Sequence, residues 1–302
     1  AKEVLAALKK GEVGYAFVYE NEEGQGLALY QEQLGGVWME ASMAFLMQEL
    51  LEIFQPFFAD SAYRKIGHDV KKDIRFLRSY GYDGFAAEFD TAIGAYILNA
   101  TGSSYEYDDI AAAFLNETYP SQEEVFGKGR TKKAFAALPE AERTAYGARQ
   151  AEIFFRARKV MEERLAENEQ KSLFYDMEMP LIYVLADMEK YGIKVDKAAL
   201  LAYQKRLGES LDGMEEEIYA LAGEKFNINS PKQLGVILFE KLGLKGGKKT
   251  KTGYSTAADV LEKLRTAHPI VERILHYRQL AKLKSTYADG LLAVMDAETE
   301  KI

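Results

Sequence analysis

The stretch that decides the fold of the C-terminal part reads NINSPKQLGVILFEKL at 227–242, KTKTGYST at 249–256 and YRQLAKLKSTY at 277–287. Ser230 followed by Pro231 is a typical helix start, because a serine hydroxyl can accept from free backbone amides and proline suits the first helical position. Gln233 completes a capping box in this prediction. Apolar residues then recur at helical spacing, which predicts a helix with one buried face.

A basic tip follows this predicted helix. Residues 245–253 contain three glycines, four lysines and no acid. Because the tip has almost no apolar anchor, we expect it to be disordered as long as no partner is bound to it. Thr256 and Asp259 then predict the start of the next helix by the same capping logic.

Charge sets this region apart from the rest of the chain. Residues 225–288 hold 13 Lys and Arg against 4 Asp and Glu, a net charge of +9 in a chain whose net charge is −8. Arg278 and Lys282 are four residues apart on one helical face, and Lys284 and Ser285 follow them. Cations interleaved with hydroxyls suit contacts to the phosphates of a nucleic acid. The alternative is a solvated, lysine-rich surface loop.

The three quoted strings resemble the thumb of the bacterial family A DNA polymerases (the DNA polymerase I family). In that family the thumb grips the primer–template duplex along its backbone and minor groove. The resemblance implies duplex DNA as the partner. The positions to which it assigns DNA contacts are Asn229, Ser230, Lys248, Lys249, Thr250, Lys251, Ser255, Thr256, Arg278, Lys282, Lys284 and Ser285.

Composition excludes several other kinds of site. The chain has 302 residues, no cysteine and three scattered histidines. Disulfides, thiolate metal sites and cysteine nucleophiles are therefore excluded, and a histidine-based zinc site is not expected. No apolar run has the length of a membrane span and no signal-peptide pattern is present, so we expect a cytoplasmic protein without a membrane partner.

The N-terminal part alternates short strands and helices. Strands are predicted at 13–19, 26–30 and 36–39, with helices at 42–58 and 70–80, which indicates an α/β domain. The resemblance implies a ribonuclease-H-like, 3′–5′ exonuclease-like domain over residues 1–168. A mostly helical thumb segment is expected over 169–302, with a long helix at 197–222.

In the family, such a nuclease holds two divalent metals on four carboxylates from three motifs. In the first motif, AFVYEN, Val18 replaces an aspartate and Glu20 keeps the second acid. A slipped register would instead pair Glu20 with Glu22, at the cost of the Ala-Phe match. The second motif, IGHDVKKD, keeps Asp73 but has Asp69 where the family has asparagine.

The third motif keeps Tyr146 but has Gln150 in place of its aspartate. A neutral amide does not neutralise two dications as carboxylates do. We therefore expect no catalytic residue and no metal in this chain, with Glu20, Asp73 and Tyr146 as degenerate remnants. In that case Asp73 would merely lie on a solvated helix face.

Two alternatives stay open. One is an active, metal-dependent 3′–5′ proofreading exonuclease that still binds metal through Glu20 and Asp73. The other is a non-catalytic scaffold that docks proteins through its acidic first domain. Asp90 and Thr91 also match the family pattern, and we expect them to serve the fold rather than a site.

The carboxylate motifs of a polymerase palm and the cationic helix of the fingers do not occur before Ile302. Phosphoryl transfer depends on positioned metals and phosphate-binding cations. We therefore expect this chain not to polymerise alone. The resemblance implies that the parent is a DNA-directed DNA polymerase that uses Mg²⁺, with its palm and fingers as further partners of this chain.

Overall fold

The computed structural model describes residues 1–246, 249–250 and 253–302, which form two compact units, Ala1–Tyr191 and Gly192–Ile302. The division comes later along the chain than the Glu169 boundary expected from the sequence. The reason is packing, because Phe174, Met179 and Ile182 join the hydrophobic core of the first unit. As a boundary between functional domains, Glu169 stays a prediction.

The first unit is built on a mixed five-stranded sheet with the strand order β3-β2-β1-β4-β5. The β1–β2 and β2–β3 pairs are antiparallel, whereas β1–β4 and β4–β5 are parallel. The strands are β1 (Gly11–Glu20), β2 (Glu23–Gln31), β3 (Gly35–Glu40), β4 (Tyr63–Gly67) and β5 (Phe89–Asp90).

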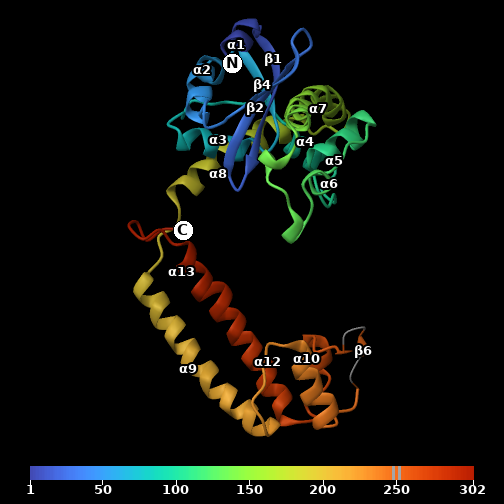
Figure 1. The fold of residues 1–302 in the computed structure, drawn as a ribbon, viewed down its shortest axis with the longest axis vertical. Helices are drawn as coiled ribbons and strands as arrows, with labels where there is room; N and C mark the ends of the chain where they lie inside the picture. The colour runs from blue at the N-terminus through green and yellow to red at the C-terminus, as the bar shows by residue number, and fades with distance from the viewer. Residues whose placement is uncertain (247–248, 251–252) are drawn as a thin grey trace. The chain divides into compact units, whose positions relative to one another are not determined.

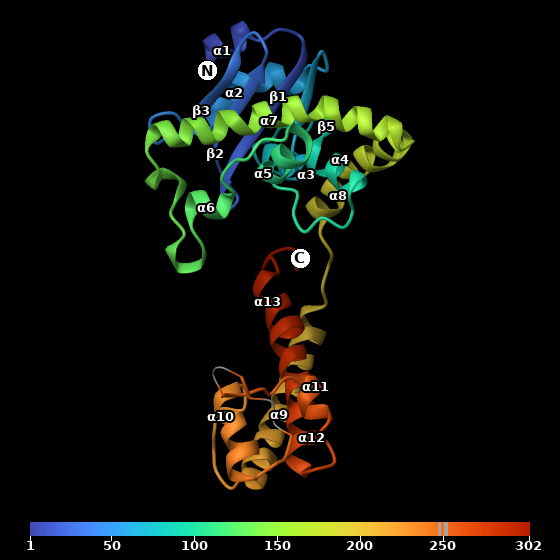
Figure 2. The same cartoon turned by 90° about the vertical axis from the view of Figure 1, so that its right-hand side faces the viewer.

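Helices cover the sheet. Figures 1 and 2 show the long helix α7 crossing one face of it, with α2 on the other side. The helices and helical turns of this unit are α1 (Lys2–Ala7), α2 (Met47–Ala59), α3 (Val70–Ser79), α4 (Thr91–Leu98), α5 (Tyr107–Ile110), η1 (Ala111–Leu115), α6 (Gln122–Phe126), η2 (Gly129–Thr131), η3 (Phe135–Ala137), α7 (Glu140–Glu167), η4 (Leu173–Glu178) and α8 (Met179–Tyr191).

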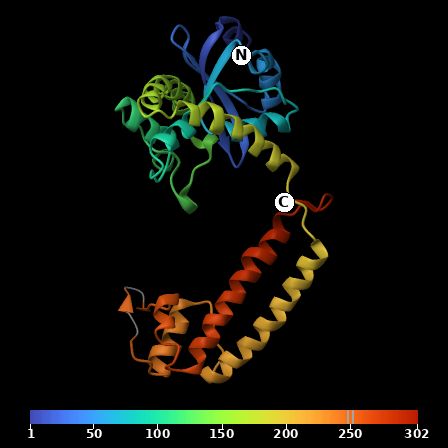
Figure 3. The same cartoon turned by 180° about the vertical axis from the view of Figure 1, so that it is seen from behind.

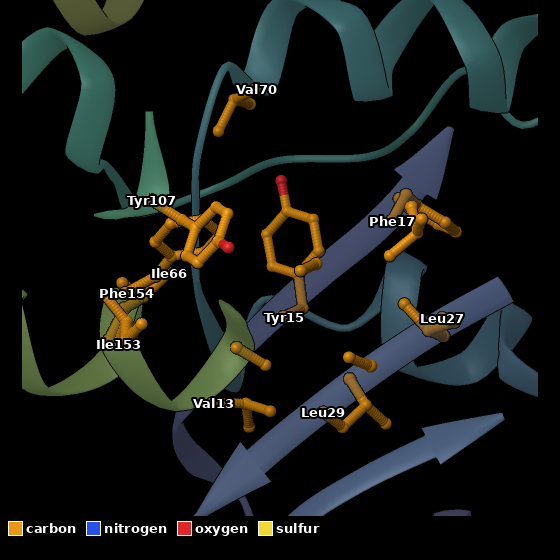
Figure 4. Close-up of a cluster of buried hydrophobic side chains, with 14 of the residues drawn as sticks. Val13, Tyr15, Phe17, Leu27, Leu29, Ile66, Val70, Tyr107, Ile153 and Phe154 are labelled. Carbon is orange, nitrogen blue, oxygen red and sulfur yellow. The ribbon is translucent and has the colours of Figure 1, made fainter. Parts of the chain in front are cut away.

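Strand alternation decides what lies on each face of β1. Gly14 lies so close to α7 that a Cβ there would come within 2.3 Å of the Ala151 carbonyl oxygen. The neighbouring Tyr15 and Phe17 are fully or almost fully buried in the aromatic core. In Figure 4 both side chains extend from β1, and the Tyr15 hydroxyl points towards the start of α3, where Val70 lies. The core therefore reaches the site described below.

One predicted helix start in this unit is wrong. Ser42 was expected to cap the second helix, but α2 begins at Met47 with Leu46 as its N-cap residue. Ser42 instead forms an isolated β-bridge with Phe45. Residues 42–46 therefore make a turn before the helix.

The second unit is helical. It is built around the helices α9 and α12, which lie side by side (Figures 1 and 3). Leu211, Ile218, Ile274 and Leu275 are among the residues of its core. Its elements are α9 (Lys197–Ala222), α10 (Pro231–Gly235), η5 (Val236–Lys241), β6 (Lys249–Thr250), β7 (Gly253–Tyr254), α11 (Ala258–Glu262), α12 (Pro269–Lys282), η6 (Leu283–Asp289) and α13 (Gly290–Val294).

Only some of the helix starts predicted from the sequence are found in this unit. Ser230 is the N-cap of α10 and accepts from the Gln233 amide at 3.4 Å, as expected. The Gln233 side chain does not close a capping box but accepts from the Asn227 amide at 2.8 Å. The predicted Thr256 cap is wrong, because α11 begins at Ala258 and the buried Thr256 is bonded elsewhere.

At the basic tip, β6 and β7 form a short antiparallel pair. The tip was expected to be disordered. That expectation stays a prediction, because it also concerns residues 247–248 and 251–252, which lie outside the described residues. The helices of the described residues include none long and apolar enough to cross a membrane.

Candidate functional site

The three nuclease-like motifs meet at one pocket of about 360 Å³ in the first unit. Val18 from β1, Asp73 from α3, and Tyr146 and Gln150 from α7 all line it. The sequence therefore predicted correctly which segments come together. Val18 lies in this pocket and Glu22 lines a neighbouring one, whereas Glu20 lines neither of them.

Asp73 is buried rather than solvated, which corrects the expectation for this residue. Only 3% of it is exposed, and its Oδ1 accepts a hydrogen bond of 2.7 Å from the Tyr19 hydroxyl. Burial raises the pKa of Asp73 well above its usual value, and the tyrosine hydrogen bond opposes this shift only in part. The carboxyl is thus held inside the protein as a partner of tyrosine.

The other remnant groups are also occupied within the protein. The Glu20 carboxylate accepts from the Phe135 amide at 3.1 Å. Gln150 donates to the Tyr146 carbonyl oxygen on its own helix at 3.4 Å. Tyr146 is 8% exposed, and burial raises the pKa of its hydroxyl. The Glu20 and Gln150 side chains therefore bond to backbone groups of the protein.

The residues present do not fit a two-metal nuclease site. Val18 is apolar at one carboxylate position, and Gln150 is a neutral amide at another. Across the described residues, no group of three or more histidine, aspartate or glutamate side chains could hold a metal ion. Hard divalent cations need several charged oxygen ligands gathered around one point. Asp69 and Glu106 line the pocket together with Asp73, but these carboxylates do not form such a group.

Asp90 and Thr91 serve the fold, as expected. Asp90 is 1% exposed and accepts from the amides of Val70 and Ala92, at 2.7 and 2.9 Å, so it joins the starts of α3 and α4. The Thr91 hydroxyl donates to the Gly67 carbonyl oxygen at 3.0 Å. It also lies 2.9 Å from the Nδ1 of His68, whose pKa burial lowers to about 4.

A second pocket, of about 440 Å³, lies in the second unit. Arg278 and Lys282 line it together, which agrees with their predicted placement on one face of a helix. The loop before α10 contributes Asn229, and η6 contributes Lys284 and Ser285. Five of the twelve predicted DNA contacts therefore meet at this basic pocket, and Leu211, Ala281 and Asp289 complete its lining.

Arg278 and Thr256 interact with each other. The Arg278 guanidinium donates to the Thr256 carbonyl oxygen and, at 3.2 Å, to its hydroxyl. Thr256 is 5% exposed, and burial lowers the pKa of Arg278. In this structure the pair connects α12 to the segment before α11, so Thr256 is not available to a phosphate.

The remaining predicted contacts lie outside this pocket. Ser230 caps α10, and the Ser255 hydroxyl accepts from the Ala257 amide at 3.4 Å. Lys249 and Thr250 belong to β6. Lys248 and Lys251 lie outside the described residues.

Three participants in these pockets, Tyr19, Lys72 and Asp289, were not foreseen from the sequence. Tyr19 holds Asp73, and the Lys72 ammonium lies 4.3 Å from the centre of the Tyr19 ring. In the second unit, Asp289 pairs with Lys284 at 2.9 Å. Tyr19 and Asp73 are 54 residues apart, so no local pattern reveals that contact. The five-residue spacing of Lys284 and Asp289 can be read from the sequence. It brings the two side chains together in a π-helical turn but not in a regular α-helix.

Two family models match the chain. "DNA polymerase I, ribonuclease H-like domain" matches residues 15–156, and "DNA polymerase family A" matches residues 197–302. DNA polymerase I of Bacillus subtilis (strain 168) is 44% identical over 254 residues, which cover 83% of this chain and 28% of the relative. DNA polymerase I of Streptococcus pneumoniae (strain TIGR4) is 45% identical over 251 residues, covering 80% of this chain and 28% of the relative.

A solved structure, the POL domain of Pol1 from M. smegmatis in complex with DNA primer-template and dNTP, matches with a TM-score of 0.72 and 27% identity. The match covers 97% of this chain and 48% of that one. The chain thus spans under a third of the curated relatives' length. This chain combines the α/β, ribonuclease-H-like fold and the mostly helical polymerase segment that were expected from the sequence. The chain belongs to family A of the DNA polymerases.

Proposed function

We propose that the second unit binds the backbone of duplex DNA and that the first unit is a ribonuclease-H-like remnant without nuclease activity. Residues 1–168 would then form the remnant and residues 169–302 the first part of the polymerase domain. In a full-length DNA-directed DNA polymerase, this chain would hold the primer–template. A palm and fingers using Mg²⁺ would add nucleotides.

The observation that carries the DNA proposal is the basic pocket of Asn229, Arg278, Lys282, Lys284 and Ser285. It presents cations and short polar side chains, which suit contacts to phosphates. The solved relative was captured with a DNA primer-template. We therefore expect salt-sensitive binding with little sequence preference.

Lys282 is the residue to test, because it is exposed and lines the pocket. Lys282→Ala should weaken binding of a fluorescently labelled primer–template about 8-fold at 0.1 M salt, the value for one lost phosphate contact. Lys205→Ala is the matched control. Lys205 lies on α9 of the same unit, is 79% exposed in its side chain and does not line the pocket. Equal losses in both variants would argue against the pocket.

The remnant proposal rests on Asp73 and on the missing carboxylates at Val18 and Gln150. Wild-type protein incubated with labelled single-stranded DNA and Mn²⁺ should leave the DNA intact. Cutting that disappears in Asp73→Ala would instead support the proofreading exonuclease.

A further inference from the structure

The last helix of the second unit contains a π-helical turn, η6, that changes which side chains face each other. Side chains five residues apart on an α-helix point about 140° away from each other, at 3.6 residues per turn. A π-turn, with its i→i+5 hydrogen bonds, returns residue i+5 to nearly the same face. Lys284 and Asp289 are such a pair, and the Lys284 ammonium lies 3.1 and 2.9 Å from the two Asp289 carboxylate oxygens.

Asp289 is itself held in place from the neighbouring helix. The Gln204 side-chain amide, on α9, donates to Asp289 Oδ1 at 2.6 Å. These hydrogen bonds from Gln204 and Lys284 hold the pKa of Asp289 below its usual range. The carboxylate is thus ionised and fixed beside Lys284, with 39% of its side chain exposed.

The Lys284–Asp289 pair is relevant to DNA binding because both residues line the basic pocket. Among the described residues that line it, Asp289 is the acid in a group with three cations. Lys284 is 30% exposed in its side chain, and two of its contacts already go to carboxylate oxygens. Binding releases counterions from the DNA when protein cations neutralise its phosphates. A lysine whose charge is already balanced by a neighbouring acid neutralises no phosphate, so it adds little to the affinity.

We propose that Asp289 limits the DNA affinity of the second unit by occupying the Lys284 ammonium, so that a phosphate must compete with it. This inference rests on the proposed function and deepens it. Asp289 is a positioning residue, since it acts through Lys284 and not through contact with DNA. Its removal should increase binding, whereas removal of a DNA contact should decrease it.

The test is Asp289→Asn, measured by anisotropy of a labelled primer–template across salt concentrations. Asparagine keeps an oxygen for Gln204 and removes the charge. Freeing one lysine should steepen the slope of log K against log salt by about 0.9 and tighten binding roughly 8-fold at 0.1 M salt. Asp289→Ser is a second variant, and the urea midpoint of each protein, followed by circular dichroism, checks that it is folded.

Glu272→Gln is the matched control because it makes the same change in net charge on the same helical segment. Glu272 is 67% exposed, is near Arg265 at 3.8 Å, and precedes Asp289 by 17 residues, roughly 25 Å of helix. That separation exceeds the Debye length of about 10 Å at 0.1 M salt. Glu272→Gln should therefore change the affinity less than twofold. In a Lys284→Ala background, Asp289→Asn should have no further effect.

Each other outcome overturns the inference. Unchanged or weaker binding by the folded Asp289 variants would mean that Asp289 does not restrain Lys284. An equal gain in Glu272→Gln, or in the Lys284→Ala background, would trace the effect to net charge alone. If none of the proteins binds the duplex at low salt, the proposed function is wrong and the inference falls with it. The salt slope of wild type separates these two failures.

Discussion

Replacing Asp73 by asparagine should stabilise the first unit at neutral pH. Asp73 is buried beside the Tyr19 hydroxyl, and burial raises its pKa above the ordinary value of 3.8. Between these two pKa values the folded protein holds a proton that the unfolded chain has released. Its stability therefore falls as pH rises, by about 1.4 kcal/mol per pH unit for one such group. Below pH 3.8 both states hold the proton, and the effect vanishes.

Asparagine cannot titrate, but it keeps an oxygen that accepts from Tyr19. Its amide can donate to the Tyr15 hydroxyl, which is buried beside residue 73. The difference in unfolding free energy between Asp73→Asn and wild type should thus grow by about 1.4 kcal/mol per pH unit from near pH 4. It should level off above the folded-state pKa.

The assay is urea unfolding followed by tryptophan fluorescence at several pH values. The chain has one tryptophan, Trp38 on β3, so the signal reports the first unit alone. Asp83→Asn is the control, because its side chain is 67% exposed and the same substitution there should stay within about 0.5 kcal/mol. An Asp73→Asn variant that is less stable than wild type at pH 7, or a gain that does not change with pH, would refute the reasoning.

Three further changes test the packing. Arg278→Ala should destabilise the second unit by about 1.5–3 kcal/mol, because it removes charged hydrogen bonds to the buried Thr256; a loss below 0.5 kcal/mol by circular dichroism would contradict this role. Gly147→Ala should cost about 1–3 kcal/mol in the Trp38 transition, since a Cβ there would lie 2.2 Å from the Trp38 ring. Gly213→Ala, whose Cβ would meet nothing within 4 Å, should instead stabilise α9 by up to about 1 kcal/mol.

The elements that depend on local patterns could be predicted from the sequence. The helix expected at 197–222 is α9 with the same bounds, since a regular apolar stripe specifies both its length and its buried face. The cap at Ser230 followed from residue type and spacing. The Ser42 and Thr256 caps were wrong because a capping residue signals a helix start only where the following residues have helical backbone geometry.

For the candidate sites, the sequence could predict only those features that depend on recognisable motifs. The motifs indicated that segments near residues 18, 73 and 146 come together, and they line one pocket. The surroundings of Asp73 could not be foreseen, because the Tyr19 contact depends on strand pairing and on the position of α3. The Lys284–Asp289 pair depends on a π-helical turn, and we found no residue pattern that predicts this turn.

The salt dependence of duplex binding by the unmodified chain and by Lys282→Ala is the decisive test of the basic pocket. We expect log K to fall linearly with log salt for the unmodified chain, and Lys282→Ala to make the slope shallower by about 0.9. No binding at low salt, or an unchanged slope in the variant, would contradict the claim that the basic pocket holds the DNA backbone.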